Sequence, residues 1–154
     1  MSNEIVNYNP EQVTLLQMRA DPKRFPRLKS LSSADAIYGL TRIVSQAFLY
    51  KGQNQEATNI RFIATALFNE LMEDKVYGAQ FISLAEIQHV IKRAVLASDM
   101  VGISVSSLYK VIMDYVKGEG HRLQVLVEES RRKANPASPM IQAYAGKFIN
   151  KQNQ

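Results

Sequence analysis

Residues 83–117, SLAEIQHVIKRAVLASDMVGISVSSLYKVIMDYVK, specify most of the architecture. They open with Ser83-Leu-Ala-Glu86, a capping-box pattern in which the serine and glutamate side chains satisfy each other's free backbone amides at a helix start. Apolar residues then recur at steps of three and four on both sides of a turn at residues 102–104, the spacing of a half-buried helix. We therefore predict two amphipathic helices, each with one buried face.

The preceding segment predicts a helical hairpin. Ser32 or Ser33 caps a helix that runs to about Lys51, Gly52 ends it, and a second helix opens at residues 54–55. Because the connection is short, we expect the two helices to pack as antiparallel neighbours. Their predicted buried positions are Ile37, Leu40, Val44, Ala47, Phe48, Ile60, Ile63, Ala64, Leu67, Phe68, Leu71 and Met72.

The N-terminal flank predicts a short helix followed by an arm. Asn9-Pro10-Glu11 is typical of a helix start, and the helix should run to about Ala20, where Asp21-Pro22 ends it. Two prolines and four basic residues occupy residues 22–30. We therefore expect this stretch to be an extended, solvated arm.

The C-terminal flank predicts two further helices. Gly118 and Gly120 should break the chain after the capped pair, and a helical pattern follows over residues 121–134. Asn135-Pro136 ends it, and a last short helix is expected over residues 140–149.

These elements predict an all-α protein, a small helical bundle with an N-terminal arm and a C-terminal helical extension. We divide it into an N-terminal helix and basic arm (residues 1–32), a helical core domain (33–118) and a basic C-terminal helical extension (119–154). Two segments, 75–82 and 125–127, have compositions that also permit extended chain. With 154 residues, 46% of them hydrophobic and 21% charged, the chain has the size and composition of one ordinary domain with a core.

Composition excludes several classes of function. The chain has no cysteine, and its two histidines, His89 and His121, are far apart in sequence. We therefore expect no metal site, no thiol chemistry and no cofactor. No apolar run reaches the roughly 18 residues of a membrane helix, and residues 1–8 lack a secretory signal pattern. We expect a cytoplasmic protein without a membrane partner.

The formal net charge of +5 lies in the flanks. Residues 33–118 carry eight basic and eight acidic side chains, whereas residues 1–32 sum to +2 and residues 119–154 to +3. A neutral body with basic ends is typical of a module whose ends contact nucleic acid or an acidic protein surface, and solvation alone is the alternative. Phe25 would stack on a base or pack the arm onto the bundle, and we favour packing. The candidate contact residues are Lys23, Arg24, Phe25, Arg27, Lys29, Arg131, Arg132 and Lys133.

Candidate catalytic groups are few. Ser107-Leu-Tyr-Lys110 matches the Ser-x-x-Lys pattern of serine acyltransferases, but their partner motifs are missing and a helical protein lacks their sheet. The acidic pairs Glu73-Asp74 and Glu128-Glu129 diverge by roughly 100° on a helix, so neither forms facing carboxylates. We expect no catalytic residue and a protein that is not an enzyme.

Residues 97–111 resemble the turn and second helix of helix-turn-helix DNA-binding proteins. Gly102 would give the turn a positive φ, and Ser106, Tyr109 and Lys110 would form the face presented to DNA. Only one of these side chains is a cation, whereas a groove-reading helix normally presents several basic or amide groups. We therefore favour a plain helical core over sequence-specific recognition.

Residues 83–117 as a unit resemble small phage and mobile-element proteins in which a helical hairpin precedes a capped helix and a second helix that ends in tyrosine. Some of these resemble the helical domain of phage replicative-helicase loaders, although the ATPase half of some loaders is absent here. The resemblance implies an accessory protein that binds a replicative helicase ring and delivers it to its site of action. The residues that carry it are Leu84, Glu86, Ile87, Gly102, Ile103, Val105 and Tyr115.

The sequence thus predicts a non-catalytic helical adaptor of a phage or mobile element, active in DNA replication in the cytoplasm of a bacterial host. Its expected partner is another protein, either a replicative helicase or a phage structural protein, and both DNA contact and self-association are left open. Two alternatives stand beside it. One is a structural or assembly component of a phage particle, located in the virion, and the other is a helix-turn-helix regulator.

Overall fold

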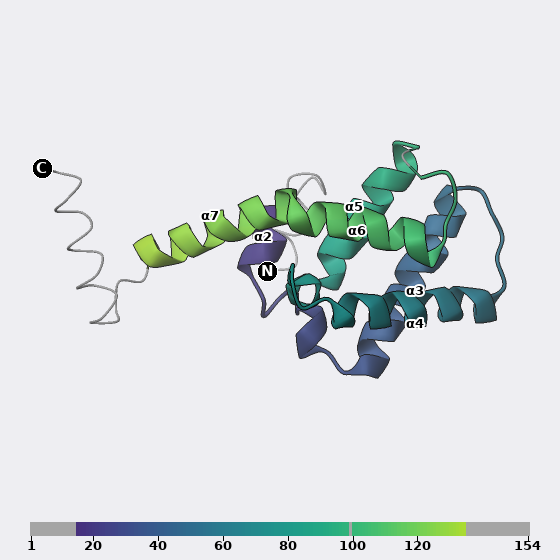
Figure 1. Ribbon diagram of the computed structural model, residues 1–154, viewed down its shortest axis with the longest axis horizontal. Helices are drawn as coiled ribbons and strands as arrows, with labels where there is room; N and C mark the ends of the chain where they lie inside the picture. Colours follow the sequence, from purple (N-terminus) through teal and green to yellow (C-terminus); the bar gives the residue numbers. More distant parts are fainter. Residues whose placement is uncertain (1–14, 99, 135–154) are drawn as a thin grey trace, which may run out of the picture.

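The computed structural model describes residues 15–98 and 100–134, and within these ranges it is helical without a β-strand (Figure 1). The all-α prediction is confirmed. The helices are α2 (Leu15–Ala20), α3 (Ser33–Tyr50), α4 (Ala57–Glu73), α5 (Leu84–Leu96), α6 (Val105–Lys117) and α7 (Glu119–Ala134), with short 3-10 helices η1 (Leu28–Ser30) and η2 (Ala79–Phe81).

Serine side chains begin three of these helices. Ser32 accepts a backbone amide at the start of α3, as predicted. At α5, Ser83 and Glu86 bond reciprocally, which confirms the capping box. Ser104 and Ser107 form a second reciprocal pair at α6, where the sequence pattern predicted only a turn. Each cap satisfies backbone amides that a helix start leaves without partners.

Four helices form a closed bundle. α3 packs against α4 and α5, and α6 packs against the same two helices, so each helix contacts two neighbours around one core. Each contributes a wholly buried side chain, Leu40, Leu67, Ile87 and Leu108 in chain order. The predicted pairing of the two helices of residues 33–73 is therefore present. Nine of the twelve positions predicted to be buried are buried, and Ile37, Ile63 and Met72 are partly buried.

The flanking helices α2 and α7 pack against each other at one end of this bundle. α2 contacts α7 and α5, and α7 contacts α6. Figure 1 shows α7 running outward past the four-helix bundle, with α2 beside its first turns. Segments from the two ends of the described chain are thus neighbours in space.

The arm is not extended, so that part of the prediction is wrong, whereas Lys23, Arg24 and Lys29 are exposed to solvent as expected. After a turn at residues 22–24 the chain enters η1, where Leu28 is wholly buried and its amide donates to the Ile82 carbonyl at 2.9 Å. Arg27 and Ser83 form an isolated antiparallel bridge beside it. Burying one leucine side chain stabilises a fold by about 1.5–3 kcal/mol, which favours a docked arm despite its charge.

Gly120 does not break the chain, contrary to the prediction. Gly118 alone separates α6 from α7, while Gly120 is buried in the first turn of α7. A Cβ at position 120 would lie 2.9 Å from the Tyr115 carbonyl oxygen. This glycine therefore allows close approach of two helices, which a pattern that treats glycine as a breaker does not reveal.

The remaining predictions have mixed outcomes. Residues 75–82 form a loop with η2, and residues 125–127 are part of α7, so neither segment is extended. The expected helix of residues 140–149 and the start of the N-terminal helix lie outside the described residues. In the part of the chain that the structure describes, none of the helices combines the length and apolar character needed to span a membrane.

Candidate nucleic-acid interface

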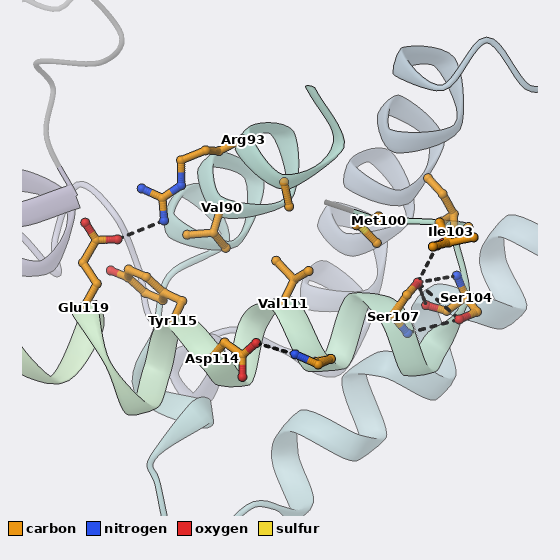
Figure 2. A pocket seen from close by; sticks show the side chains of 14 residues that line it. Val90, Arg93, Met100, Ile103, Ser104, Ser107, Val111, Asp114, Tyr115 and Glu119 are labelled. Atoms are coloured by element: carbon orange, nitrogen blue, oxygen red, sulfur yellow. Dashed lines mark hydrogen bonds and ion pairs between the residues drawn. The ribbon is translucent and has the colours of Figure 1, made fainter. Parts of the chain in front are cut away.

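A groove of about 740 Å³ lies between α5, the loop before α6, and α6 itself (Figure 2). Its charged groups are paired: Arg93 contacts Glu119 at 2.9 Å, and Lys110 contacts Asp114 at 2.8 Å. The hydrogen bond to Asp114 raises the pKa of Lys110. The groove therefore holds charge pairs at its surface and no set of converging free acids and bases among the described residues. Its apolar lining consists of Val90, Ala94, Met100, Val101, Ile103 and Val111.

The predicted serine–lysine pair has separate partners in this groove. The Ser107 hydroxyl donates to the Gly102 carbonyl at 2.7 Å and also caps α6, while the Lys110 amine bonds Asp114. The hydroxyl serves the helix start, and the amine serves a surface ion pair. Among residues 15–98 and 100–134, no cluster of three or more histidine, aspartate or glutamate side chains is placed to hold a metal ion.

The segment that resembles a helix-turn-helix has an unsuitable connection. Residues 97–104 separate α5 from α6, whereas the DNA-binding motif uses a turn of about three to four residues. Within this connection the positive φ falls at Ser98 (60°) and not at Gly102, which corrects that expectation. On the predicted reading face, Ser106 is exposed, Tyr109 packs partly against the core, and Lys110 is paired.

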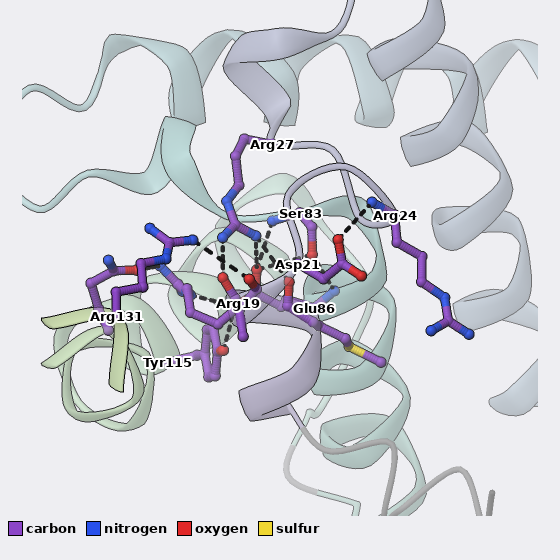
Figure 3. Close-up of polar contacts among 11 residues, drawn as sticks. Arg19, Asp21, Arg24, Arg27, Ser83, Glu86, Tyr115 and Arg131 are labelled. Atoms are coloured by element: carbon purple, nitrogen blue, oxygen red, sulfur yellow. Dashed lines mark hydrogen bonds and ion pairs between the residues drawn. The ribbon is translucent and has the colours of Figure 1, made fainter. Parts of the chain in front are cut away.

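Glu86 is the centre of a buried polar cluster (Figure 3). One carboxylate oxygen, Oε1, accepts hydrogen bonds from Arg19 Nε at 2.8 Å and the Tyr115 hydroxyl at 2.6 Å. The other, Oε2, accepts from the Ser83 amide at 2.8 Å and the Ser83 hydroxyl at 2.9 Å, with Arg27 Nη1 at 3.7 Å. We call these five residues the Glu86 cluster.

The Glu86 cluster fastens the N-terminal flank to the bundle. Glu86 has no solvent exposure, and Arg19 from α2 lies against it. The negative charge of Glu86 and the positive charge of Arg19 therefore compensate each other. Burial, followed by the charge of Glu86, raises the pKa of the Tyr115 hydroxyl. The predicted contact residue Arg27 is partly buried here and donates to the Met18 carbonyl at 3.0 Å. Its guanidinium therefore serves the fold, and we exclude it from the interface.

The two basic flanks meet beside this cluster. Arg131 Nη2 of α7 donates to the Ala20 carbonyl at 3.5 Å, across 111 positions of sequence, and Lys23 and Arg24 follow shortly after Ala20. Figure 3 shows Arg131 reaching from α7 toward the end of α2. The folded chain thus collects positive charge from both ends of its described sequence at one end of the molecule.

The cations at this junction are available to a partner. We define the basic surface as Lys23, Arg24, Lys29, Arg131, Arg132 and Lys133. All six side chains are exposed to solvent, and none forms an ion pair within 4 Å with a carboxylate of the described residues.

Three ring–cation pairs lie on the arm and on the segments that follow it in contact, since η1 contacts η2 and η2 contacts α6. The Arg24 guanidinium lies 5.6 Å from the centre of the neighbouring Phe25 ring. The Lys29 amine lies 5.1 Å from the centre of the Phe81 ring, which comes from η2. A third pair, Lys117 of α6 over Tyr77, has a distance of 4.5 Å.

The sequence predicts the cations of this interface but not most of its rings. Phe25 is indicated by its neighbours in sequence, whereas Tyr77, Phe81 and Lys117 come from segments whose pattern predicts only a loop and a helix end. The one sequence signal of the two rings is their position around Gly78, which takes a left-handed conformation with φ of 79°: Tyr77 directly precedes it and Phe81 follows it by three residues. The pairing with lysines from elsewhere in the chain depends on the fold.

Comparison with known proteins gives no assignment: the chain matches no protein-family model, no curated protein and no solved structure. The resemblance to phage replication accessory proteins therefore stays a prediction from the sequence.

Proposed function

We propose that the protein is a non-catalytic helical adaptor that binds nucleic acid through its basic surface. The observation that carries this proposal is the meeting of the two basic flanks, with Arg131 of α7 against the end of α2. A phosphate backbone attracts clustered lysine and arginine side chains in proportion to the number of charges that it meets. Two sets of three cations at one end of the molecule supply such a cluster.

Neither the helix dipole nor simple solvation accounts for the whole charge pattern. Arg131, Arg132 and Lys133 occupy the last turn of α7, where cations also compensate the helix dipole. That effect does not explain Lys23, Arg24 and Lys29, which belong to no α-helix. Simple solvation would be served equally well by cations spread over the whole surface, whereas residues 33–118 are neutral.

Nucleic acid is favoured over an acidic protein by the rings among the cations. Phe81 and Tyr77 are large aromatic side chains that are about half exposed beside Lys29 and Lys117. Nucleic-acid bases stack on such rings, and the neighbouring cations neutralise the phosphates.

The proposal is tested by fluorescence anisotropy of labelled 20-nucleotide DNA and RNA, single-stranded and duplex, titrated with the full chain over a salt series. We expect salt-dependent binding that weakens by about tenfold or more when Lys23, Arg24 and Lys29 are changed to alanine. The matched control changes Arg42, Arg61 and Lys92, three exposed cations of the bundle, and should have little effect. Absence of binding at low salt, or an equal loss in the control, would refute the proposal.

The wider setting that we propose is DNA replication in a phage or mobile element, with a replicative helicase as the protein partner. The support for this setting is the resemblance of residues 83–117. Copurification of the full chain with a helicase would support it, whereas recovery of the chain in assembled particles would favour the alternative of a virion component.

A further inference from the structure

We propose that the nucleic acid bound at the basic surface is single-stranded and that Phe81 and Tyr77 stack on its bases, an inference that rests on the proposed function. The site is a strip of three ring–cation pairs that we call the aromatic strip: Arg24 with Phe25, Lys29 with Phe81, and Lys117 with Tyr77. The placement of these pairs, the way they are held and their exposure each support single-strand binding.

The segments that carry the strip are in contact, beginning with the arm, which lies along the segment that precedes α5. Arg27 and Ser83 are bridged in antiparallel fashion, and the Leu28 amide bonds the Ile82 carbonyl at 2.9 Å. Next to that bridge η1 contacts η2, and the Lys29 amine of η1 lies 5.1 Å from the centre of the Phe81 ring of η2. η2 also contacts α6, the helix that ends with Lys117. The three pairs therefore come from segments that touch one another in succession.

The loop that carries the two rings is held by the Asp74 side chain. The Asp74 carboxylate accepts hydrogen bonds from the amides of Val76 and Tyr77 at 3.1 Å each and from the Ala79 amide at 2.9 Å. Burial of the carboxylate acts to raise its pKa, but these amides outweigh it and lower the pKa of Asp74, so the ionised form is the one that the loop binds. Ala79 is wholly buried and fixes the loop to the bundle. A ring on a braced loop loses little freedom when a base stacks on it.

The rings are exposed although each is large and apolar. Phe81 has 46% and Tyr77 has 53% of its surface exposed, and each has a lysine amine over its ring. A base in a duplex is already stacked on both faces, whereas an unpaired base has free faces for such rings. The lysines beside the rings provide the charge that the adjoining phosphates need.

Most ring–cation pairs of the described chain belong to the aromatic strip. Of the four ring–cation pairs in residues 15–98 and 100–134, three belong to the strip. The fourth joins Lys92 to Tyr50 at 5.8 Å. Tyr50 ends α3, so it lies about 25 Å along that helix from the end nearest η1. It is a ring of similar exposure, 42%, outside the strip.

These facts define matched variants for a binding experiment. The full chain is titrated into fluorescein-labelled oligo-dT of 20 nucleotides and into a labelled duplex of about 20 base pairs at the same salt. Phe81→Leu and Tyr77→Leu each remove an aromatic face from the strip, and Tyr50→Leu removes one outside it. Far-UV circular dichroism confirms that each variant keeps its helices.

We expect the full chain to bind oligo-dT more tightly than duplex. Phe81→Leu and Tyr77→Leu should each weaken oligo-dT binding by about tenfold, while duplex binding changes by less than about twofold and Tyr50→Leu changes neither. A second measurement uses Phe81→Trp, which introduces an indole into a chain that has no tryptophan. Its fluorescence should be quenched by oligo-dT and not by duplex.

The outcomes separate this inference from the proposed function. If the ring variants bind oligo-dT as tightly as the unchanged chain, while changing the arm cations still weakens binding, the surface reads phosphates alone and the stacking inference is wrong. Equal affinity for duplex and oligo-dT, or an indole whose fluorescence oligo-dT does not quench, would also show that the stacking inference is wrong. If the full chain binds neither probe, the proposed function fails as well.

Discussion

Glu86 has two roles, and only one of them is visible in the sequence. Its position three residues after Ser83 marks it as half of a capping box, and that prediction is confirmed. The fold then uses the same carboxylate as the only buried acid of the described core, paired with Arg19 of α2. A capping motif is local, so its sequence predicts it, whereas the partner of a buried charge lies 67 positions away and depends on how α2 docks.

Tyr115→Phe tests the Glu86 cluster. The change removes the hydrogen bond of 2.6 Å to the carboxylate and keeps the ring, so we expect a loss of about 1.5–3 kcal/mol in the free energy of unfolding near neutral pH. Because burial and Glu86 raise the pKa of Tyr115 in the folded protein, the contribution is complete below the ordinary tyrosine pKa of about 10. It is lost as the pH rises through the folded-state pKa.

Denaturant unfolding of the two proteins at several pH values between about 7 and 11 measures this contribution. The difference in unfolding free energy between the unchanged chain and Tyr115→Phe should shrink above about pH 10. A difference that stays constant over the whole range would show that the hydroxyl is not coupled to a buried carboxylate.

At the scale of elements, the sequence predicts the helices of the bundle well and the junctions poorly. Apolar spacing indicates α3, α5 and α6, and serine caps indicate the starts of α3 and α5, because both signals are local. Prolines and cations dominate the arm and predict a solvated chain, yet Leu28 docks it, and a single buried leucine is too weak a pattern to predict this. The prediction for Gly120 is wrong for a similar reason, since its role depends on the distance between α6 and α7.

Gly120→Ala tests the close approach at this junction. The new methyl group would lie 2.9 Å from the Tyr115 carbonyl oxygen and 3.2 Å from Arg19 Nη2, and backbone atoms yield little. Alanine is otherwise favoured over glycine in a helix by roughly 0.8–1.0 kcal/mol, but the clash should outweigh this and destabilise the fold by about 1–3 kcal/mol.

Chemical denaturation of Gly120→Ala beside Gly102→Ala gives the comparison. Position 102 has no atom within 4 Å of an added Cβ, and its φ lies outside the left-handed region, so that variant should change stability by less than about 0.5 kcal/mol. If Gly120→Ala were as stable as the unchanged chain, α6 and α7 would not meet as closely as described.

For the whole molecule, the charge distribution is the property that the sequence predicts and the fold reorganises. The basic flanks are evident from counting residues, because residues 33–118 are neutral. Their meeting is not evident, since it needs α2 and α7 to pack together, and no local pattern reports on that contact. The rings of the aromatic strip are a further product of packing, because they become neighbours of Lys29 and Lys117 only in the folded chain.

The proposed function requires both flanks to form one nucleic-acid surface, and the salt dependence of oligo-dT affinity is its sharpest test. Each phosphate neutralised on a single strand contributes roughly 0.7 to the slope of log affinity against log salt concentration. The variant Arg131→Ala, Arg132→Ala, Lys133→Ala removes the α7 cations and keeps the arm. We predict that its slope is smaller in magnitude by about 2 than that of the unchanged chain. An unchanged slope would mean that these cations serve only the end of α7 and that the two flanks do not act as one surface.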